Sequence, residues 1–167
     1  LWYQGCSDTN PGPAEKYLEH FREYVEATRK ELGYEIPFFT MQLNRQINGI
    51  NDECWGMVRD AQARAAKEIP GVSVLTTSNL SLCDGIHNTA QANVALGEKL
   101  AKQCAHVLNG KEEYQPPELV KVERADEAER KSFQLEGSGI WLKLTCDHVK
   151  NCFLVYSAMG KDSGFTL

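Results

Sequence analysis

Short apolar segments alternate with amphipathic helical segments along the first 110 residues of the chain, and this order constrains the fold more than any other feature. The apolar segments are residues 1–4, 35–43 and 72–78. After each of them, apolar side chains recur every three or four residues, which predicts three helices. The first starts at Pro11 and Pro13 and stops at Gly33, and the others cover residues 53–69 and 89–108. Strands and helices in this order are typical of an α/β fold, in which helices cover both faces of a parallel sheet and make three layers.

Proline and glycine mark the ends of these helices. Pro11 and Pro13 suit a first helical turn, Gly33 ends the first helix, and Gly110 follows the third. The spacing of small and apolar residues predicts the buried side of the third helix at Ala90, Val94, Gly97, Ala101, Cys104 and Leu108.

The composition changes after Pro116 and Pro117, which predicts a domain boundary near residues 111–117. Beyond it, alternating, β-branched and aromatic residues predict a small antiparallel unit of about four strands. The predicted strands are residues 119–125, 131–137, 139–145 and 152–158. We therefore expect two domains, residues 1–110 and a truncated β-rich segment over 111–167.

The composition also argues against several classes of function. A net charge of −5 without a Lys/Arg stripe argues against a nucleic-acid partner, and no apolar run approaches the roughly 20 residues that span a bilayer. The six cysteines form no CxxC pair, so we expect neither a metal nor another cofactor. Their wide spacing permits a disulfide framework but does not require one, and buried free thiols are the better interpretation for most of them.

The loops at the carboxyl ends of the predicted strands hold the residues best suited to chemistry, because ligands of open parallel sheets bind there. In "CDGIHN", Asp84 stands three residues before His87 in a turn that Gly85 opens. A carboxylate at this spacing can accept from the imidazole Nδ1–H and stabilise the charged ring, as a general base near neutral pH requires. The alternative, an Asp-Gly turn followed by a structural histidine, stays open at this point.

Three segments resemble blocks of the SGNH hydrolases, in particular their sialate O-acetylesterase and acetylxylan-esterase branch. "LWYQGCSDT" is similar to a "WYQGESD" block, "IPFFTMQL" to a strand that commonly reads "PF…VQL", and "DGIHNTAQANVALGEKLA" to the last block. They occur in the family's order within residues 1–110. The resemblance implies a flavodoxin-like sheet and an O-acetylated carbohydrate of the sialic acid or xylan type as substrate. It favours a secreted or periplasmic location without fixing one, and the sequence leaves the oligomeric state open.

The resemblance also assigns roles to individual residues. His87 matches the family's general base and Asp84 the carboxylate that orients it. Gly5 matches a glycine whose backbone comes close to the substrate. The neighbouring block residues, which match the same motif and are expected to line the site, are Gln4, Ser7 and Asp8, although Asp8 also suits a turn. Cys6 stands where the family has Glu, and a thiol cannot replace that carboxylate.

The family nucleophile is a serine in a "GQSN"-like block at the first strand, upstream of the "WYQGESD" block. We find no such block in these 167 residues. We therefore expect the chain to be the C-terminal half of an esterase domain that starts at a core strand. The N-terminal part and its serine are then missing, and we expect the chain alone to be inactive.

Two alternatives remain at this stage. A catalytically silent carbohydrate-binding module on the same scaffold would explain Cys6 in place of Glu, although the Asp84–His87 pair argues against it. A thiol hydrolase would use Cys6 with His87. In that case a protonated imidazole would lower the pKa of the Cys6 thiol and make it the most reactive of the cysteines.

Overall fold

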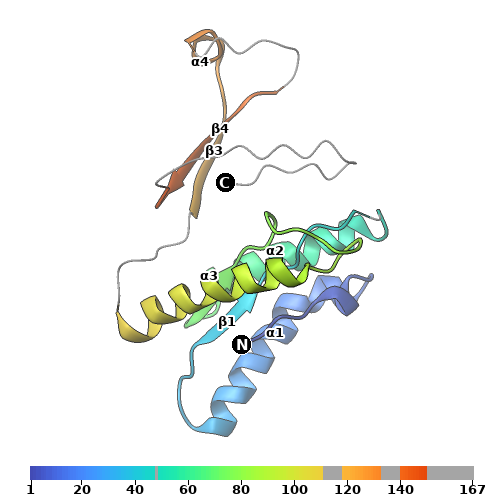
Figure 1. The fold of residues 1–167 in the computed structure, drawn as a ribbon, viewed down its shortest axis with the longest axis vertical. Helices are drawn as coiled ribbons and strands as arrows, with labels where there is room; N and C mark the ends of the chain where they lie inside the picture. Colours follow the sequence, from blue (N-terminus) through green and yellow to red (C-terminus); the bar gives the residue numbers. More distant parts are fainter. Residues whose placement is uncertain (48, 111–117, 133–139, 150–167) are drawn as a thin grey trace.

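The computed structural model describes residues 1–47, 49–110, 118–132 and 140–149 (Figure 1). The elements of the first 110 residues are the 3₁₀ turn η1 (Cys6–Asp8), helix α1 (Pro13–Leu32), strand β1 (Phe38–Met41), helix α2 (Asp52–Glu68), strand β2 (Val72–Leu75) and helix α3 (Ala90–Asn109). The remaining elements are strand β3 (Glu118–Arg124), helix α4 (Glu127–Ser132) and strand β4 (Leu142–Asp147).

The first sheet is parallel, as the strand–helix order predicts. Strand β1 pairs with β2 in a register that places Phe38 opposite Val72. Residues 1–4 lie along the other edge of β1, where Trp2 and Thr40 form a parallel bridge. The Trp2 N–H donates to the Phe39 carbonyl at 2.9 Å, and the Met41 N–H donates to the Trp2 carbonyl at 3.2 Å. The strands are shorter than the apolar segments predict, because pairing ends where the chain turns into the loops.

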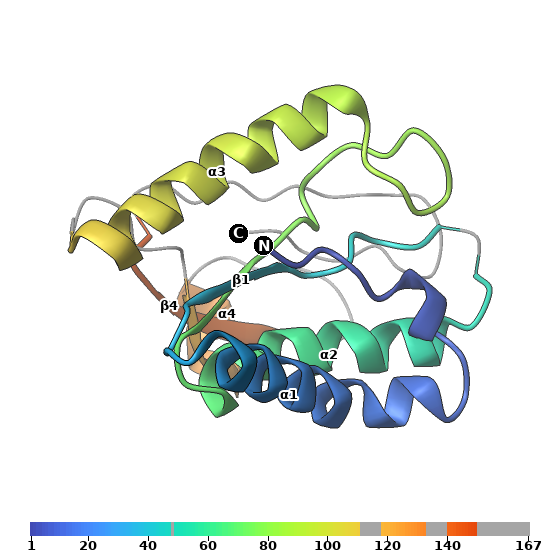
Figure 2. The same cartoon turned by 90° about the horizontal axis from the view of Figure 1, so that it is seen from below.

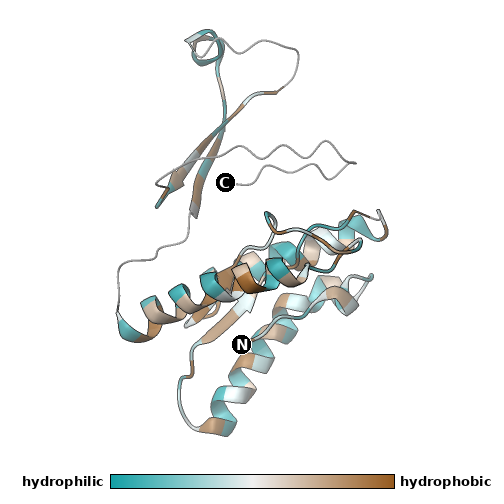
Figure 3. Cartoon of the chain, in the orientation of Figure 1, coloured by the Kyte–Doolittle hydropathy of each residue, from teal (hydrophilic) through white to brown (hydrophobic). Residues whose placement is uncertain are grey.

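Helices cover both faces of this sheet, which confirms the predicted three layers. Figure 2 shows α1 and α2 on one side of β1 and α3 on the other. All four residues of β1 are buried, and the strand is mostly brown in the hydropathy view of Figure 3. The core on the α1 and α2 side includes Phe21, Val25, Phe38, Val58 and Val72, and the core under α3 contains Met41, Leu75, Leu80, Ala92 and Leu96.

Two helices end at the glycine positions that the sequence predicts, and one of them begins at a predicted proline. Pro13 occupies the first turn of α1, and Gly33 ends the helix in the left-handed conformation with a φ of 76°. Thr89 caps the start of helix α3, and its side chain accepts from the Ala92 N–H at 3.1 Å. The helix ends before Gly110, which is also left-handed. The local sequence therefore determines where these two helices start and stop.

The buried side of α3 differs from the prediction. Val94 is 66% exposed and Leu108 is 60% exposed, whereas the side chains that face the sheet include Ala92 and Leu96. Four of the six predicted positions are Ala, Gly or Cys, so that face offers little area for burial. The helix instead turns Leu96 and Leu100 toward the sheet, because burying more apolar area stabilises the fold more.

The β-rich segment matches the prediction only in part. Strands β3 and β4 pair antiparallel and correspond to the predicted strands 119–125 and 139–145. The start of the predicted strand 131–137 belongs instead to α4. The reason is a capping box: Asp126 Oδ1 accepts from the Glu129 N–H at 2.8 Å, and Glu129 Oε2 accepts from the Asp126 N–H at 3.1 Å. Residues 133–137 and the predicted strand 152–158 lie outside the described residues.

One buried side chain connects four elements of the first sheet and its helices. Gln62 of α2 is 1% exposed. Its Oε1 accepts from the Leu43 N–H at 2.7 Å, and its Nε2 donates to the Gln4 carbonyl at 2.9 Å and to the Tyr17 hydroxyl at 3.2 Å. Gln62 therefore joins the ends of residues 1–4 and β1 to both α1 and α2.

We predict that Gln62→Leu lowers the free energy of unfolding by about 2–4 kcal/mol, because each buried polar group left without a partner costs roughly 1–3 kcal/mol. Urea denaturation of the chain measures the change. Gln91→Leu, on the exposed side of α3, is the matched control and is expected to stay within about 0.5 kcal/mol of the parent. Equal stability of the Gln62→Leu variant and the parent would contradict this role for Gln62.

Candidate active site

The loops at the carboxyl ends of residues 1–4, β1 and β2 are bonded to one another. The Ile47 N–H donates to the Gly85 carbonyl at 3.0 Å. Asn44 Nδ2 donates to Asn88 Oδ1 at 2.6 Å, and Asn88 Nδ2 donates to the Tyr3 hydroxyl at 3.0 Å. The three loops therefore meet at the edge of the sheet where parallel α/β folds bind their ligands.

Asp84 and His87 form a hydrogen-bonded pair in the loop after β2. His87 Nδ1 lies 2.7 Å from Asp84 Oδ2. The other carboxylate oxygen, Oδ1, accepts from the backbone N–H groups of Ile86 and His87 at 2.8 and 2.7 Å. The Cys83 N–H closes the turn on the His87 carbonyl at 2.9 Å. Backbone N–H groups of the turn thus hold the Asp84 carboxylate, and the carboxylate in turn holds the His87 imidazole. The spacing of the two residues predicts this contact.

The same hydrogen bonds set the charge of Asp84. They lower the pKa of its carboxyl from 3.8 to about 2, the Ile86 N–H contributing most and the His87 side chain next. The folded state therefore favours the ionised carboxylate, and this preference is fully present above pH 3.8 and lost as the pH falls toward 2. The side chains of His87 and Asp84 are 63% and 52% exposed, so an ionised acceptor and an imidazole are both open to a ligand.

Gly5 occupies a position that only glycine fits. It precedes η1 with a φ of 144°, a conformation that other residues rarely adopt. A Cβ at this position would lie 3.0 Å from both Gln62 Nε2 and Val58 Cγ1. The carbonyl of Gly5 accepts from the Asp8 N–H at 2.9 Å, which starts the turn. The sharp turn after residues 1–4 therefore depends on the absence of a side chain.

Cys6 and Cys83 differ from the prediction. Burial raises the pKa of the Cys6 thiol, and the charge of Asp84 raises it further. The expectation that His87 lowers the pKa of Cys6 is therefore wrong, because the nearby charge that acts on the half-buried thiol is negative. Both cysteines are free, and Cys83 is exposed. The expectation of buried thiols is wrong for the cysteines in the described residues, because the other four are only partly buried.

Gln4 and Asp8 of the first block contact each other beside α1. Gln4 Nε2 donates to Asp8 Oδ2. The two side chains lie in a hollow of about 320 Å³ whose other lining residues are Trp2, Tyr17, His20, Phe21 and Tyr24. Neither Asp84 nor His87 lines this hollow. Ser7 is exposed, and its carbonyl accepts from Asn10 Nδ2 at 3.2 Å. Of the first block, Cys6 lies close enough to Asp84 for the carboxylate charge to raise the pKa of its thiol.

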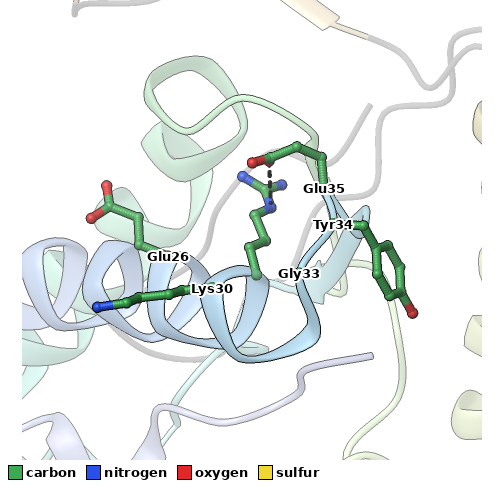
Figure 4. Close-up of a pocket in the computed structure, with 6 residues that line it drawn as sticks. Glu26, Lys30, Gly33, Tyr34 and Glu35 are labelled. Atoms are coloured by element: carbon green, nitrogen blue, oxygen red, sulfur yellow. Dashed lines mark ion pairs between the residues drawn. The ribbon is translucent and has the colours of Figure 1, made fainter.

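A larger hollow of about 510 Å³ lies at the end of α1 (Figure 4). Within it, Arg29 Nε lies 3.1 Å from Glu35 Oε2. The same guanidinium donates to the Pro70 carbonyl at 2.8 Å and to the Ile36 carbonyl at 3.1 Å. Arg29 therefore bonds to the segments just before β1 and β2, at the end of the sheet opposite His87. We interpret this hollow as part of the packing between α1 and the sheet.

Sequence reasoning missed the polar residues that hold the site together. Asn44 is 1% exposed, and its backbone carbonyl accepts from the Trp55 indole N–H at 2.8 Å. Arg45 donates to the carbonyls of Ser78 and Leu80 at 2.7 and 3.3 Å. The available signal was the abrupt change from the apolar "PFFTMQL" to "NRQ". Polar residues directly after a buried strand are the first candidates for such contacts.

In the described part of the chain, no group of three or more His, Cys, Asp or Glu side chains is placed to hold a metal ion. No helix in the same residues is long and apolar enough to cross a membrane.

A family model described as "Carbohydrate esterase, sialic acid-specific acetylesterase" matches residues 1–106. The chain belongs to this carbohydrate esterase family. The match spans β1, β2 and the Asp84–His87 turn. A search of curated proteins gives no match.

Two solved structures resemble the chain. A novel carbohydrate acetylesterase from Xanthomonas citri is 26% identical with a TM-score of 0.64, and the match covers 74% of this chain and 29% of that protein. A protein from Arabidopsis thaliana is 28% identical with a TM-score of 0.54, and the match covers 65% of this chain and 43% of that protein. The chain therefore spans less than half the length of either.

The raised pKa and half-burial of Cys6 reverse the expected order of thiol reactivity. We predict that brief iodoacetamide treatment of the folded chain labels Cys83 faster than Cys6, because alkylation requires an accessible thiolate. Peptide mapping measures the labelled fraction at each cysteine, and treatment after unfolding in urea gives the reference. Preferential labelling of Cys6 would restore the thiol-hydrolase alternative.

Proposed function

We propose that this chain contributes the general base and its orienting carboxylate to a serine esterase that removes O-acetyl groups from a carbohydrate. The observation that carries the proposal is the 2.7 Å contact between His87 Nδ1 and Asp84 Oδ2. The family assignment supports ester hydrolysis and a carbohydrate substrate. A sialic acid or a related O-acetylated sugar is the proposed substrate.

In the proposed reaction, a serine hydroxyl attacks the acetyl carbonyl while His87 Nε2 accepts its proton. Asp84 holds Nδ1–H and stabilises the imidazolium that results. Backbone N–H groups near Gly5 are proposed to stabilise the tetrahedral oxyanion. His87 then returns the proton to the sugar oxygen, which leaves as an alcohol. Water attacks the acetyl-serine by the same route and releases acetate.

The serine is proposed to come from a part of the protein that these 167 residues do not contain. No "GQSN"-like block occurs in the sequence, and the matched solved structures are longer than the chain. Cys6 is a poor substitute, because burial and the Asp84 charge both raise the pKa of its thiol.

A silent carbohydrate-binding module is the second candidate, and Cys6 in place of the family's Glu is the observation that favours it. A module that only binds has no need of an imidazole oriented by a carboxylate. The bonded Asp84–His87 pair therefore favours the esterase.

We predict that the chain alone hydrolyses p-nitrophenyl acetate at the background rate, and that a protein joining it to the serine-bearing segment is active. In that active protein, His87→Ala and Asp84→Asn are each expected to lower kcat/KM by at least roughly hundred-fold, because they remove the base and the group that fixes its tautomer. Release of acetate from an O-acetylated sialic acid measures the same loss on a sugar.

His148→Ala is the control, since this histidine is exposed and lies next to β4. It is expected to retain parent activity. Turnover by the isolated chain that His87→Ala abolishes would show that the nucleophile lies within these residues. Full activity of the His87→Ala variant in the active protein would refute the proposed base.

A further inference from the structure

A polar network connects the ends of residues 1–4, β1 and β2 directly behind the loop that carries His87. Asn44 Nδ2 donates to the Leu80 carbonyl at 3.2 Å and to Asn88 Oδ1 at 2.6 Å. Asn88, the residue after His87, donates through Nδ2 to the Tyr3 hydroxyl at 3.0 Å and to Asn93 Oδ1 at 3.1 Å. The Asn88 side chain is thus bonded to Asn44, Tyr3 and Asn93.

Asn44 is itself fixed on every side. It is 1% exposed. Its Oδ1 accepts from the Arg45 N–H at 2.7 Å, and its backbone carbonyl accepts from the Trp55 indole at 2.8 Å. Because Oδ1 is occupied, Nδ2 must face Asn88, and Asn88 must present its own oxygen. Asn44 therefore determines which end of the Asn88 amide reaches Tyr3.

The Tyr3 hydroxyl extends the network to the end of β2. Burial raises the pKa of the Tyr3 hydroxyl, and polar contacts with the Asn88 and Thr77 side chains lower it by less. Thr77 is fully buried and donates to the Gln42 carbonyl at 2.8 Å. Tyr3 thereby links the segment that leads into Gly5 with the loop that holds Asp84 and His87.

We propose that Asn44, Asn88 and Tyr3 are positioning residues, which hold the Asp84–His87 turn in register with Gly5 through the amide of Asn88. This inference rests on the proposed function for its consequence in catalysis. The side chains of the pair are more than half exposed, so their placement relative to Gly5 depends on how the turn itself is held. Ile86 packs against the core, and the hydrogen bonds of Asn88 connect the turn to the ends of the neighbouring strands. A displacement of about 1 Å at a reacting centre can cost roughly hundred-fold in rate.

The test compares Asn88→Ala and Tyr3→Phe with Asn93→Ala as the matched control. Asn93 is an exposed acceptor for the same Asn88 amide, but it lies outside the bridge between the strand ends. Two readouts in the isolated chain need no activity: the NMR signal of the His87 Nδ1 proton, and hydrogen exchange at the Ile86 and His87 amides, which bond to Asp84.

Asn88→Ala is expected to broaden the Nδ1 proton signal and to speed exchange at both amides by roughly ten-fold, while the β1 amides keep the parent rate. Tyr3→Phe is expected to give a smaller change of the same kind, and Asn93→Ala none. In the serine-bearing protein, Asn88→Ala is expected to lower kcat by about ten- to hundred-fold with KM little changed.

If Asn88→Ala does not fold, Tyr3→Phe decides, because it removes one hydroxyl and keeps the ring. Parent-like proton signal and exchange in the folded variants would overturn the proposal, as would an equal effect of Asn93→Ala. Absence of esterase activity in every protein would remove the proposed function, but the two spectroscopic readouts would still decide the positioning role.

Discussion

The hydrogen bonds of Gln62 are the constraint on which the site depends. This buried amide binds the carbonyl of Gln4 and the N–H of Leu43, which are backbone groups at the ends of two neighbouring strands. Parallel strands stop pairing where their loops begin, so these groups need partners from elsewhere. Helix α2 supplies both from one side chain. Gly5 can then turn sharply against Gln62 and Val58, where a Cβ would meet both.

The side chains of the candidate pair are exposed, while Asn44 behind them is buried and hydrogen-bonded. Asp84 is held by two backbone N–H groups, and its ionised form is favoured down to a pKa of about 2. Asn44 lies in the interior and connects this turn to α2 through Trp55. A reacting side chain must be accessible to its substrate, so the residues packed behind it have to fix its position. The division between an open pair and a buried support is what an esterase of the proposed kind requires.

The sequence predicts those parts of the structure that depend on local chemistry. The ends of α1 and α3 follow from Pro13, Gly33 and Gly110, and the Asp84–His87 contact follows from a spacing of three residues within one turn. The parallel, three-layer fold follows from the order of apolar and helical segments. Each of these features is decided within a few residues or by a periodic pattern.

Features that depend on distant parts of the chain were not predictable in the same way. The buried side of α3 depends on which face offers the larger side chains to a sheet formed elsewhere in the sequence. The pKa of Cys6 depends on burial and on Asp84, 78 positions away along the chain. Asn44 and Asn88 are 44 residues apart, and neither lies in a sequence motif that predicts their contact. The boundary near residues 111–117 stays a prediction.

The most direct test of the account is a crystal structure of the protein that unites this chain with its proposed serine, trapped with a fluorophosphonate that bonds covalently to the nucleophile. We expect His87 Nε2 to lie within about 2.6–3.2 Å of the serine oxygen or the phosphonyl group, with Asp84 bonded to Nδ1. A modified serine with a different histidine at that distance, and His87 turned away, would contradict it.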